Sequence, residues 1–267
     1  MTDDGQLDRA RAFHALHRRG NPLLLVNVWD AWSATVIANA GQRAIATSSH
    51  SVAEAAGYRD GQTIPLDAFM AILARIGAST ELPVSVDIEA GFGDSAADTG
   101  ATVDAVIRAG GIGINIEDGL FGGERVLVSR DVHAAKIAAA REVACHAHVP
   151  LFINARFDGF LLNKRHDAAL VDEALRRAAL YREVGANGFF VPGLTNPEWI
   201  ARIVDECSLP VNIMLSAATP RVDELTKLGV ARISLGPWPF EFVRKALTQA
   251  VGDFAKKDGN IATFLSA

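Results

Sequence analysis

Cysteine, long apolar runs and clustered positive charge are all scarce in this chain of 267 residues. Its two cysteines, Cys145 and Cys207, are too few for a disulfide framework. No apolar run approaches the roughly 18 residues that a membrane-spanning helix needs. The net charge is −5 and lysine and arginine form no block, so we expect neither nucleic acid nor a membrane as a partner.

The first ten residues, MTDDGQLDRA, also lack the features of a secretion signal. A signal peptide begins with a basic segment and continues with an apolar one, whereas this segment is acidic and polar. We therefore expect a cytoplasmic protein. The composition, 49% hydrophobic and 21% charged, is that of an ordinary globular chain. We expect a single domain over residues 1–267, with a C-terminal helical tail from about residue 237.

What the sequence does contain is a repeated pattern of strand and helix. Short runs rich in Val, Ile and Leu alternate with Ala-rich stretches, and a glycine often precedes the next run. The predicted strands are Leu23–Trp29, Arg43–Ser49, Val84–Ala90, Ile112–Asp118, Leu151–Asp158, Gly188–Pro192, Val211–Leu215 and Arg232–Gly236. The predicted helices between them are Ala31–Ala40, Leu66–Ser79, Ala97–Ala109, Asp131–His146, Asp167–Val184, Pro197–Glu206 and Pro220–Leu228. Eight such units predict an α/β fold of the single (β/α)8 TIM-barrel type.

An open dinucleotide-binding sheet is the alternative, and its fingerprint is missing. The first predicted strand leads into Asp30-Ala31-Trp32-Ser33 instead of the G-x-G-x-x-G pattern. At the other end of the chain, Pro237-Trp238-Pro239-Phe240 is expected to interrupt the pattern before a last helix over Glu241–Lys256. This break would either direct the last helix outward, towards a partner subunit, or form a rigid loop over the barrel.

Polar and apolar side chains alternate along several predicted strands, so each strand has a polar and an apolar face. In a barrel the apolar face meets the helices, and the inward face at the C-terminal end lines the active site. The polar faces include Ser85, Asp87 and Glu89; Asn115 and Glu117; Asn154, Arg156 and Asp158; and Asn212 and Ser216. We therefore expect these side chains to meet in one cavity.

Three carboxylates in such a cavity, Asp87, Glu89 and Glu117, would repel one another. Either one of them holds a proton or a cation lies among them. Oxygen ligands suit Mg²⁺, with Mn²⁺ possible, and part of the coordination would run through water. Arg156 is a planar donor suited to a substrate carboxylate. A metal beside an arginine suits a 2-oxo acid, whose enolate the metal would stabilise. A purely structural network, with Asp158 pairing Arg156, is the alternative.

These segments resemble the motifs of the isocitrate lyase/phosphoenolpyruvate mutase superfamily. The segment VDIEAGFG at 86–93 is similar to its D-x-[DE]-x-G-[FY]-G motif, NIED at 115–118 to its IED motif, and NAR at 154–156 to its A-R motif. The segments GYRDG at 57–61 and ATSS at 46–49 resemble parts of the family's second βα unit. The resemblance runs from Asn27 to Gly236.

The resemblance implies a role for each matching residue. Asp87 would bind the metal directly, and water molecules on the metal would be held by Glu89, Glu117 and Asp60. The substrate would be bound by Ser48, Ser49, Asp87 and Arg156, in a pocket lined by Trp29 and Asn212. Trp29 is also interpreted as a core residue. The family further implies a last helix that is exchanged between subunits of a homo-oligomer, a dimer or a tetramer.

The segment after the fourth strand departs from the family. Its lyases carry a catalytic cysteine there in a K-[KR]-C-G-H loop, and its mutases a loop with Lys and Asn, whereas residues 119–127 read GLFGGERVL. The glycines suit a mobile lid, in which Arg125 either closes onto an anionic substrate or is a solvated loop residue. With Arg156, Glu117 and Arg125 as catalytic candidates, we expect a Mg²⁺-dependent lyase or decarboxylase of a small 2-oxo acid. The alternatives are a phosphoenolpyruvate mutase or phosphonopyruvate hydrolase, and a 2-oxo acid binding barrel without turnover.

Overall fold

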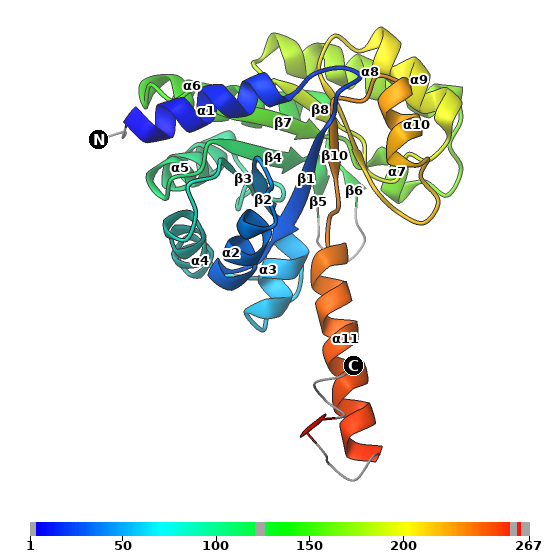
Figure 1. Cartoon of the computed structure of the whole chain (residues 1–267). Helices are drawn as coiled ribbons and strands as arrows, with labels where there is room; N and C mark the ends of the chain where they lie inside the picture. Colours follow the sequence, from blue (N-terminus) through cyan, green and yellow to red (C-terminus); the bar gives the residue numbers. More distant parts are fainter. Residues whose placement is uncertain (1–3, 121–125, 257–260, 263–267) are drawn as a thin grey trace.

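Parallel strands close into a barrel in the computed structural model, which describes residues 4–120, 126–256 and 261–262. The order around the barrel is β1-β10-β9-β8-β7-β4-β3-β2, so that β10 pairs with β1 and closes it (Figure 1). The strands are β1 (Leu23–Val28), β2 (Ile45–Thr47), β3 (Val84–Asp87), β4 (Gly113–Glu117), β7 (Phe152–Arg156), β8 (Gly188–Phe190), β9 (Val211–Met214) and β10 (Arg232–Ser234). The predicted (β/α)8 barrel is therefore confirmed, and each strand lies within its predicted range.

Helices surround this barrel and cover its outer face (Figure 1). Several begin at a side chain that accepts a hydrogen bond from the first turn, as Asp30, Ser95, Ser129 and Asp167 do. The covering helices are α2 (Ala31–Asn39), α3 (Ser49–Ala55), α4 (Leu66–Ala78), α5 (Ala96–Arg108), α6 (Arg130–His146), α7 (Gly159–Leu162), α8 (Ala168–Glu183), α9 (Pro197–Glu206) and α10 (Val222–Lys227). Of these, α3 and α7 were not predicted, because each is short; α3 begins at the last residue of a predicted strand, and α7 lies between two predicted elements.

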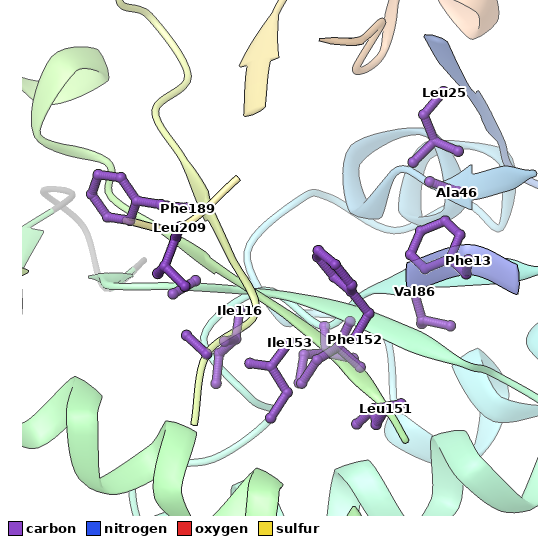
Figure 2. Packing of buried hydrophobic residues seen from close by; sticks show 14 of the residues in the cluster. Phe13, Leu25, Ala46, Val86, Ile116, Leu151, Phe152, Ile153, Phe189 and Leu209 are labelled. Atoms are coloured by element: carbon purple, nitrogen blue, oxygen red, sulfur yellow. The ribbon is translucent and has the colours of Figure 1, made fainter. Parts of the chain in front are cut away.

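The core has an outer and an inner part. Between the strands and the helices lie fully buried side chains such as Val86, Ile116 and Ile153 (Figure 2). The inner part of the core is covered at the N-terminal ends of the strands by α1 (Asp4–Leu16), which lies across this end of the barrel. The sequence pattern did not predict this helix. Its Phe13 packs edge-on against Phe152 of β7, with 5.5 Å between the ring centres (Figure 2). An apolar plug at this end leaves the opposite, C-terminal end for polar side chains.

The last helix, α11 (Trp238–Lys256), extends away from the barrel (Figure 1). The prediction that Pro237-Trp238-Pro239-Phe240 interrupts the chain before Glu241 was wrong, because the helix already begins at Trp238. Proline is tolerated in the first turn of a helix, where its missing N–H has no partner to lose. Phe242, Leu247 and Val251 of this helix are exposed. Exchange of α11 between subunits stays a prediction.

A short antiparallel pair, β5 (Gly119–Leu120) and β6 (Val126–Leu127), follows β4. The segment between them, with the predicted catalytic residue Arg125, lies outside the described residues. In the described part of the chain, no helix is both long and apolar enough to cross a membrane.

Candidate active site

A cavity of about 170 Å³ lies at the C-terminal ends of the strands. Five residues predicted for the site line it: Ser48, Ser49, Asp60, Asp87 and Arg156. They come from separate segments, namely β2 with α3, the loop before α4, β3 and β7. The parallel strands end at one rim of the barrel, which brings these segments together.

Asp87, the last residue of β3, is one of the two acidic residues that line this cavity, together with Asp60. Its Oδ2 accepts hydrogen bonds from the hydroxyl (3.1 Å) and the backbone N–H (3.4 Å) of Ser49. Its backbone N–H donates to Oγ1 of Thr47, at 2.9 Å. Burial raises the pKa of Asp87, Arg156 lowers it, and Asp60 raises it further. Asp87 therefore lies between an acidic residue and a basic one, where a bound cation would favour its charged form.

Glu89 lies two residues further on, after β3 has ended. The predicted strand continued to Ala90, but the backbone of Glu89 has φ = +50°, a left-handed conformation that ends the strand's alternation. Its Oε2 accepts the backbone N–H of Gln62, at 2.6 Å. Burial, followed by repulsion from Asp60 and Asp87, raises the pKa of Glu89 to about 8. At neutral pH and without a cation, this carboxyl group is therefore mostly protonated.

The loop after Glu89 is held by a buried lysine and a hydroxyl group. Lys136 of α6 donates through Nζ to the carbonyl oxygens of Ala90 (2.8 Å) and Gly93 (2.7 Å). Thr102 donates through its hydroxyl to the carbonyl oxygen of Gly91, at 3.0 Å. Gly91 has φ = +103°, and a Cβ atom there would lie 2.4 Å from Oγ1 of Thr99. Glycine is therefore required at this position of the motif by both conformation and space.

The carboxyl groups around Asp60 have the chemistry to bind a divalent cation. Oδ1 of Asp60 is buried and has no hydrogen-bond partner among the described residues. Asp60 also raises the pKa of both Asp87 and Glu89, which shows that these carboxyl groups lie near one another. However, no three Asp, Glu, His or Cys side chains within residues 4–120, 126–256 and 261–262 form a ready-made ligand set. The arrangement suits a cation that Asp87 contacts directly and the other carboxylates hold through water, as Mg²⁺ is often bound.

Glu117 and Arg156 form an ion pair on neighbouring strands. Nη1 of Arg156 lies 2.6 Å from Oε2 of Glu117, and its Nε donates to Oδ1 of Asp158 at 2.6 Å. Burial alone would lower the pKa of Arg156, but Asp158, Glu117 and Asp87 raise it. The guanidinium group also lies over the ring of Phe190, 5.8 Å from its centre. Arg156 is therefore a fixed positive charge beside the cavity, and its pairing with Asp158 is the contact that the structural alternative predicted.

Not every predicted residue lines the cavity. Trp29 is buried and packs edge-on against Phe240, so its interpretation as a core residue fits the structure. Asn212 is buried and donates to Ser234 at 3.3 Å. Glu89 and Glu117 also lie outside the residues that line the cavity. Their predicted roles in holding metal-bound water stay predictions.

Several residues of the cavity were given no role by the sequence. Asn27, His50, Asn115 and Ser234 line it together with Met214 and Phe190. The alternation of polar residues in the fourth strand indicated that Asn115 faces inward, but nothing in it indicated a function. Asn27 lies in an apolar run, where a single polar residue was the only signal. His50, which the sequence did not single out, lies with its Nε2 3.4 Å from Oε1 of Glu241.

Comparisons with known proteins find relatives of this chain both by sequence and by fold. Residues 13–255 match the family described as phosphoenolpyruvate phosphomutase. An uncharacterized protein of Mycobacterium tuberculosis is 34% identical over 86% of this chain and 83% of its own length. The 2-methylisocitrate lyase of Escherichia coli is 32% identical over 83% of this chain and 76% of its own length. The crystal structure of a candidate phosphonomutase from Burkholderia cenocepacia superposes with a TM-score of 0.90, at 45% identity, over 92% of this chain and 98% of the other.

Proposed function

The chain belongs to the isocitrate lyase/phosphoenolpyruvate mutase superfamily, and from this premise we propose that it is a Mg²⁺-dependent enzyme acting on a small 2-oxo acid. The proposed reaction breaks a C–C bond next to the carbonyl carbon, as a lyase or decarboxylase does. The observation that carries this proposal is that Asp87 and Arg156 both line one cavity of about 170 Å³. A cavity of this size suits a substrate of a few carbon atoms, and the two residues supply one metal ligand and one fixed positive charge.

In the proposed reaction, Asp87 would hold the metal, with Asp60, Glu89 and Glu117 around it. A bound Mg²⁺ would polarise the substrate's carbonyl group and stabilise the negative charge that develops on its oxygen. Arg156 would bind the substrate's carboxylate, because its guanidinium group is already oriented by Asp158. Ser49 would keep the Asp87 carboxylate oriented through the two hydrogen bonds that it donates. The hydroxyl oxygen of Ser48 accepts from both the backbone N–H and the hydroxyl group of Ser51, and its own hydrogen would then donate to the substrate.

A phosphonate reaction is the second candidate. The observation that favours it is the 45% identity to a protein described as a candidate phosphonomutase. In this reaction the same cavity would bind a phosphonate such as phosphonopyruvate, and a C–P bond would break. The third possibility is a barrel that binds 2-oxo acids without turnover, and an assay must distinguish it from the two enzymes.

The test is an NMR assay that resolves products. The purified protein would meet a panel of 2-oxo acids, 2-hydroxy tricarboxylates and phosphonopyruvate, each with Mg²⁺ and with EDTA. We expect Mg²⁺-dependent loss of a 2-oxo acid or of a hydroxy acid that is cleaved to one, and the products identify the bond. Turnover of phosphonopyruvate alone would establish the second candidate. Line broadening that EDTA abolishes, without turnover, would establish the binding protein and contradict the proposed reaction.

The acidic cluster also predicts how stability depends on pH. The pKa of Glu89 is raised from 4.5 to about 8 in the folded protein, so between these values the folded state binds more protons than the unfolded state. The contribution of Glu89 to the free energy of unfolding is therefore fully present below about pH 4.5 and is lost as the pH rises towards 8. Mg²⁺ should oppose this loss, because it binds the charged carboxylates and competes with protons.

Urea denaturation of the metal-free protein from pH 5 to 8.5 measures this effect. Glu89→Gln should remove part of the fall in stability and weaken the stabilisation by Mg²⁺. Asp118, whose pKa burial raises to about 6, contributes its own dependence at lower pH, so the difference between wild type and Glu89→Gln is the quantity to compare. Identical pH profiles for the two proteins would contradict the placement of Glu89 beside the other carboxylates.

We further propose that the chain is one barrel domain that assembles into a homo-oligomer through α11. The exposed side chains of Phe242, Leu247 and Val251 support this, since they would gain from burial against another copy. Sedimentation velocity of the wild type and of a Phe242→Glu variant tests it, and a monomeric wild type would contradict it.

A further inference from the structure

Beneath the cavity, a buried arginine crosses the interior of the barrel. Arg232 begins β10 and is 1% exposed. Its Nη2 donates to Oδ1 of Asn115 on β4, at 3.2 Å. In the strand order, β10 and β4 lie on opposite sides of the barrel, so this single side chain spans the barrel's interior. Its Nε and Nη1 have no hydrogen-bond partner among the described residues.

A buried charge costs free energy unless ion pairs and hydrogen bonds offset the loss of water, and Arg232 has few such contacts. Burial lowers the pKa of Arg232 to about 9, and Asp87 raises it, so the side chain remains charged at neutral pH. The guanidinium group lies over the apolar ring of Phe13, with 6.0 Å between the guanidinium carbon and the ring centre. The one side-chain oxygen that accepts a hydrogen bond from Arg232 is that of Asn115, within the described part of the chain.

The two donors that meet at Asn115 fix the orientation of its amide group. Nδ2 of Asn154 also donates to Oδ1 of Asn115, at 2.9 Å. Arginine has donors only, so the atom of Asn115 that faces it must be the oxygen and not the nitrogen. Asn154 is in turn oriented by its second donor contact, to Oδ1 of Asn212 at 3.1 Å. The amide of Asn115 therefore cannot turn over without losing both contacts.

The nitrogen of the same amide group takes no part in these contacts, which both use the oxygen. Asn115 lines the cavity, and its Nδ2 has no hydrogen-bond partner among the described residues. This atom is not among the side-chain nitrogens and oxygens that are sealed from solvent without a partner, so it is accessible. In the strand register Asn115 is paired with Asp87, the proposed metal ligand. A ligand bound at Asp87 therefore has the two N–H donors of Asn115 on the next strand.

We propose that Asn115 is a substrate-binding residue whose amide N–H groups donate to an oxygen of the bound 2-oxo acid, and that Arg232 is the positioning residue that holds the amide in this orientation. This inference rests on the proposed function and adds a residue to its site. The Arg232 charge also polarises the Asn115 amide, because it binds the oxygen whose partner nitrogen donates to the ligand. Without Arg232, the amide could turn and present its oxygen, which would repel the substrate's oxygen.

Calorimetric titration with oxalate in the presence of Mg²⁺ tests the role of Asn115. Oxalate is a small dianion, and its two adjacent carboxylates resemble the carboxylate and carbonyl group of a 2-oxo acid. Asn115→Asp keeps the acceptor for Arg232 but has no N–H to donate, and we expect it to weaken oxalate binding by roughly ten- to a hundredfold. Asn187→Asp is the matched control: Oδ1 of Asn187 also accepts from an arginine, Arg141, but lies outside the cavity. It should bind oxalate like the wild type. Unchanged affinity in Asn115→Asp would overturn the inference.

A double-mutant cycle with Arg232 separates positioning from a general effect on the fold. Arg232→Met should weaken oxalate binding, yet it should cost no further affinity in an Asn115→Ala background. Additive losses would overturn the positioning role. Folding is checked by thermal unfolding, and if Arg232→Met does not fold, Arg232→Lys provides the second variant, with partial retention of affinity expected. A wild type that binds Mg²⁺ but no oxalate would instead count against the proposed function itself.

Discussion

Replacing Asp87 by asparagine should lower Mg²⁺-dependent turnover by about a thousandfold or more, because the change removes the charge that holds the metal. The side chain keeps its shape and an oxygen that accepts from Ser49. The metal-free protein should be no less stable than the wild type. Burial and the neighbouring Asp60 already raise the pKa of Asp87, so the charge is unfavourable there without a cation.

Two measurements separate loss of the metal from loss of the fold. Calorimetry should show that Asp87→Asn binds Mg²⁺ at least a hundredfold more weakly, of the order expected for loss of a metal contact, while urea denaturation without metal shows an unchanged or higher midpoint. Asp94→Asn is the control, because Asp94 lies in the same loop but is exposed. Turnover that survives in Asp87→Asn with full Mg²⁺ dependence would show that the metal is bound elsewhere.

Replacing Arg156 by glutamine should weaken both substrate binding and the fold. The guanidinium group lies between Glu117 and Asp158, whose side chains are 2% and 0% exposed. Removal of the cation from such a buried group typically costs about 3–5 kcal/mol of the free energy of unfolding. Oxalate affinity in the presence of Mg²⁺ should fall about a hundredfold, since one charge-assisted pair is lost. Mg²⁺ affinity should change little, because the guanidinium group of Arg156 is a hydrogen-bond donor and does not itself bind a metal ion.

Arg202, a partly exposed residue, provides the matched control for this variant. It also contacts two carboxylates, Asp172 and Glu206, but on the protein surface. Arg202→Gln should leave stability and oxalate affinity nearly unchanged, because solvent screens surface ion pairs. If Arg156→Gln lost Mg²⁺ binding as completely as substrate binding, the assignment of Arg156 to the substrate would be wrong.

The barrel was predictable because its signals are local. Each strand is an apolar run, each helix has its own periodicity, and glycines such as Gly41 and Gly229 have positive φ at the turns where they were expected. The α1 helix lacked such a signal, since only Gln6, Ala10 and Phe13 of it are buried. The start of α11 was missed because a proline was read as a break, although the first turn of a helix tolerates one.

The carboxylates of the site were predictable in part. Strand alternation indicated that Asp87 and Arg156 face inward, and the structure places both at one cavity. Alternation failed at Glu89, because the left-handed backbone there ends the strand and turns the side chain towards Gln62. No periodic pattern can indicate such a change of backbone region, which depends on the packing of the following loop against Lys136 and Thr102.

Local sequence patterns were sufficient to predict the order of strands and helices, the end of the barrel that carries polar residues, and the acidic character of the site. These follow from periodicities that a chain displays over a few residues. The partners of the buried arginines depend on the folded barrel, because Arg156 with Glu117 and Arg232 with Asn115 are contacts between separate strands. The second of these pairs joins opposite sides of the barrel, across 117 residues of sequence, and exists only once the barrel has closed.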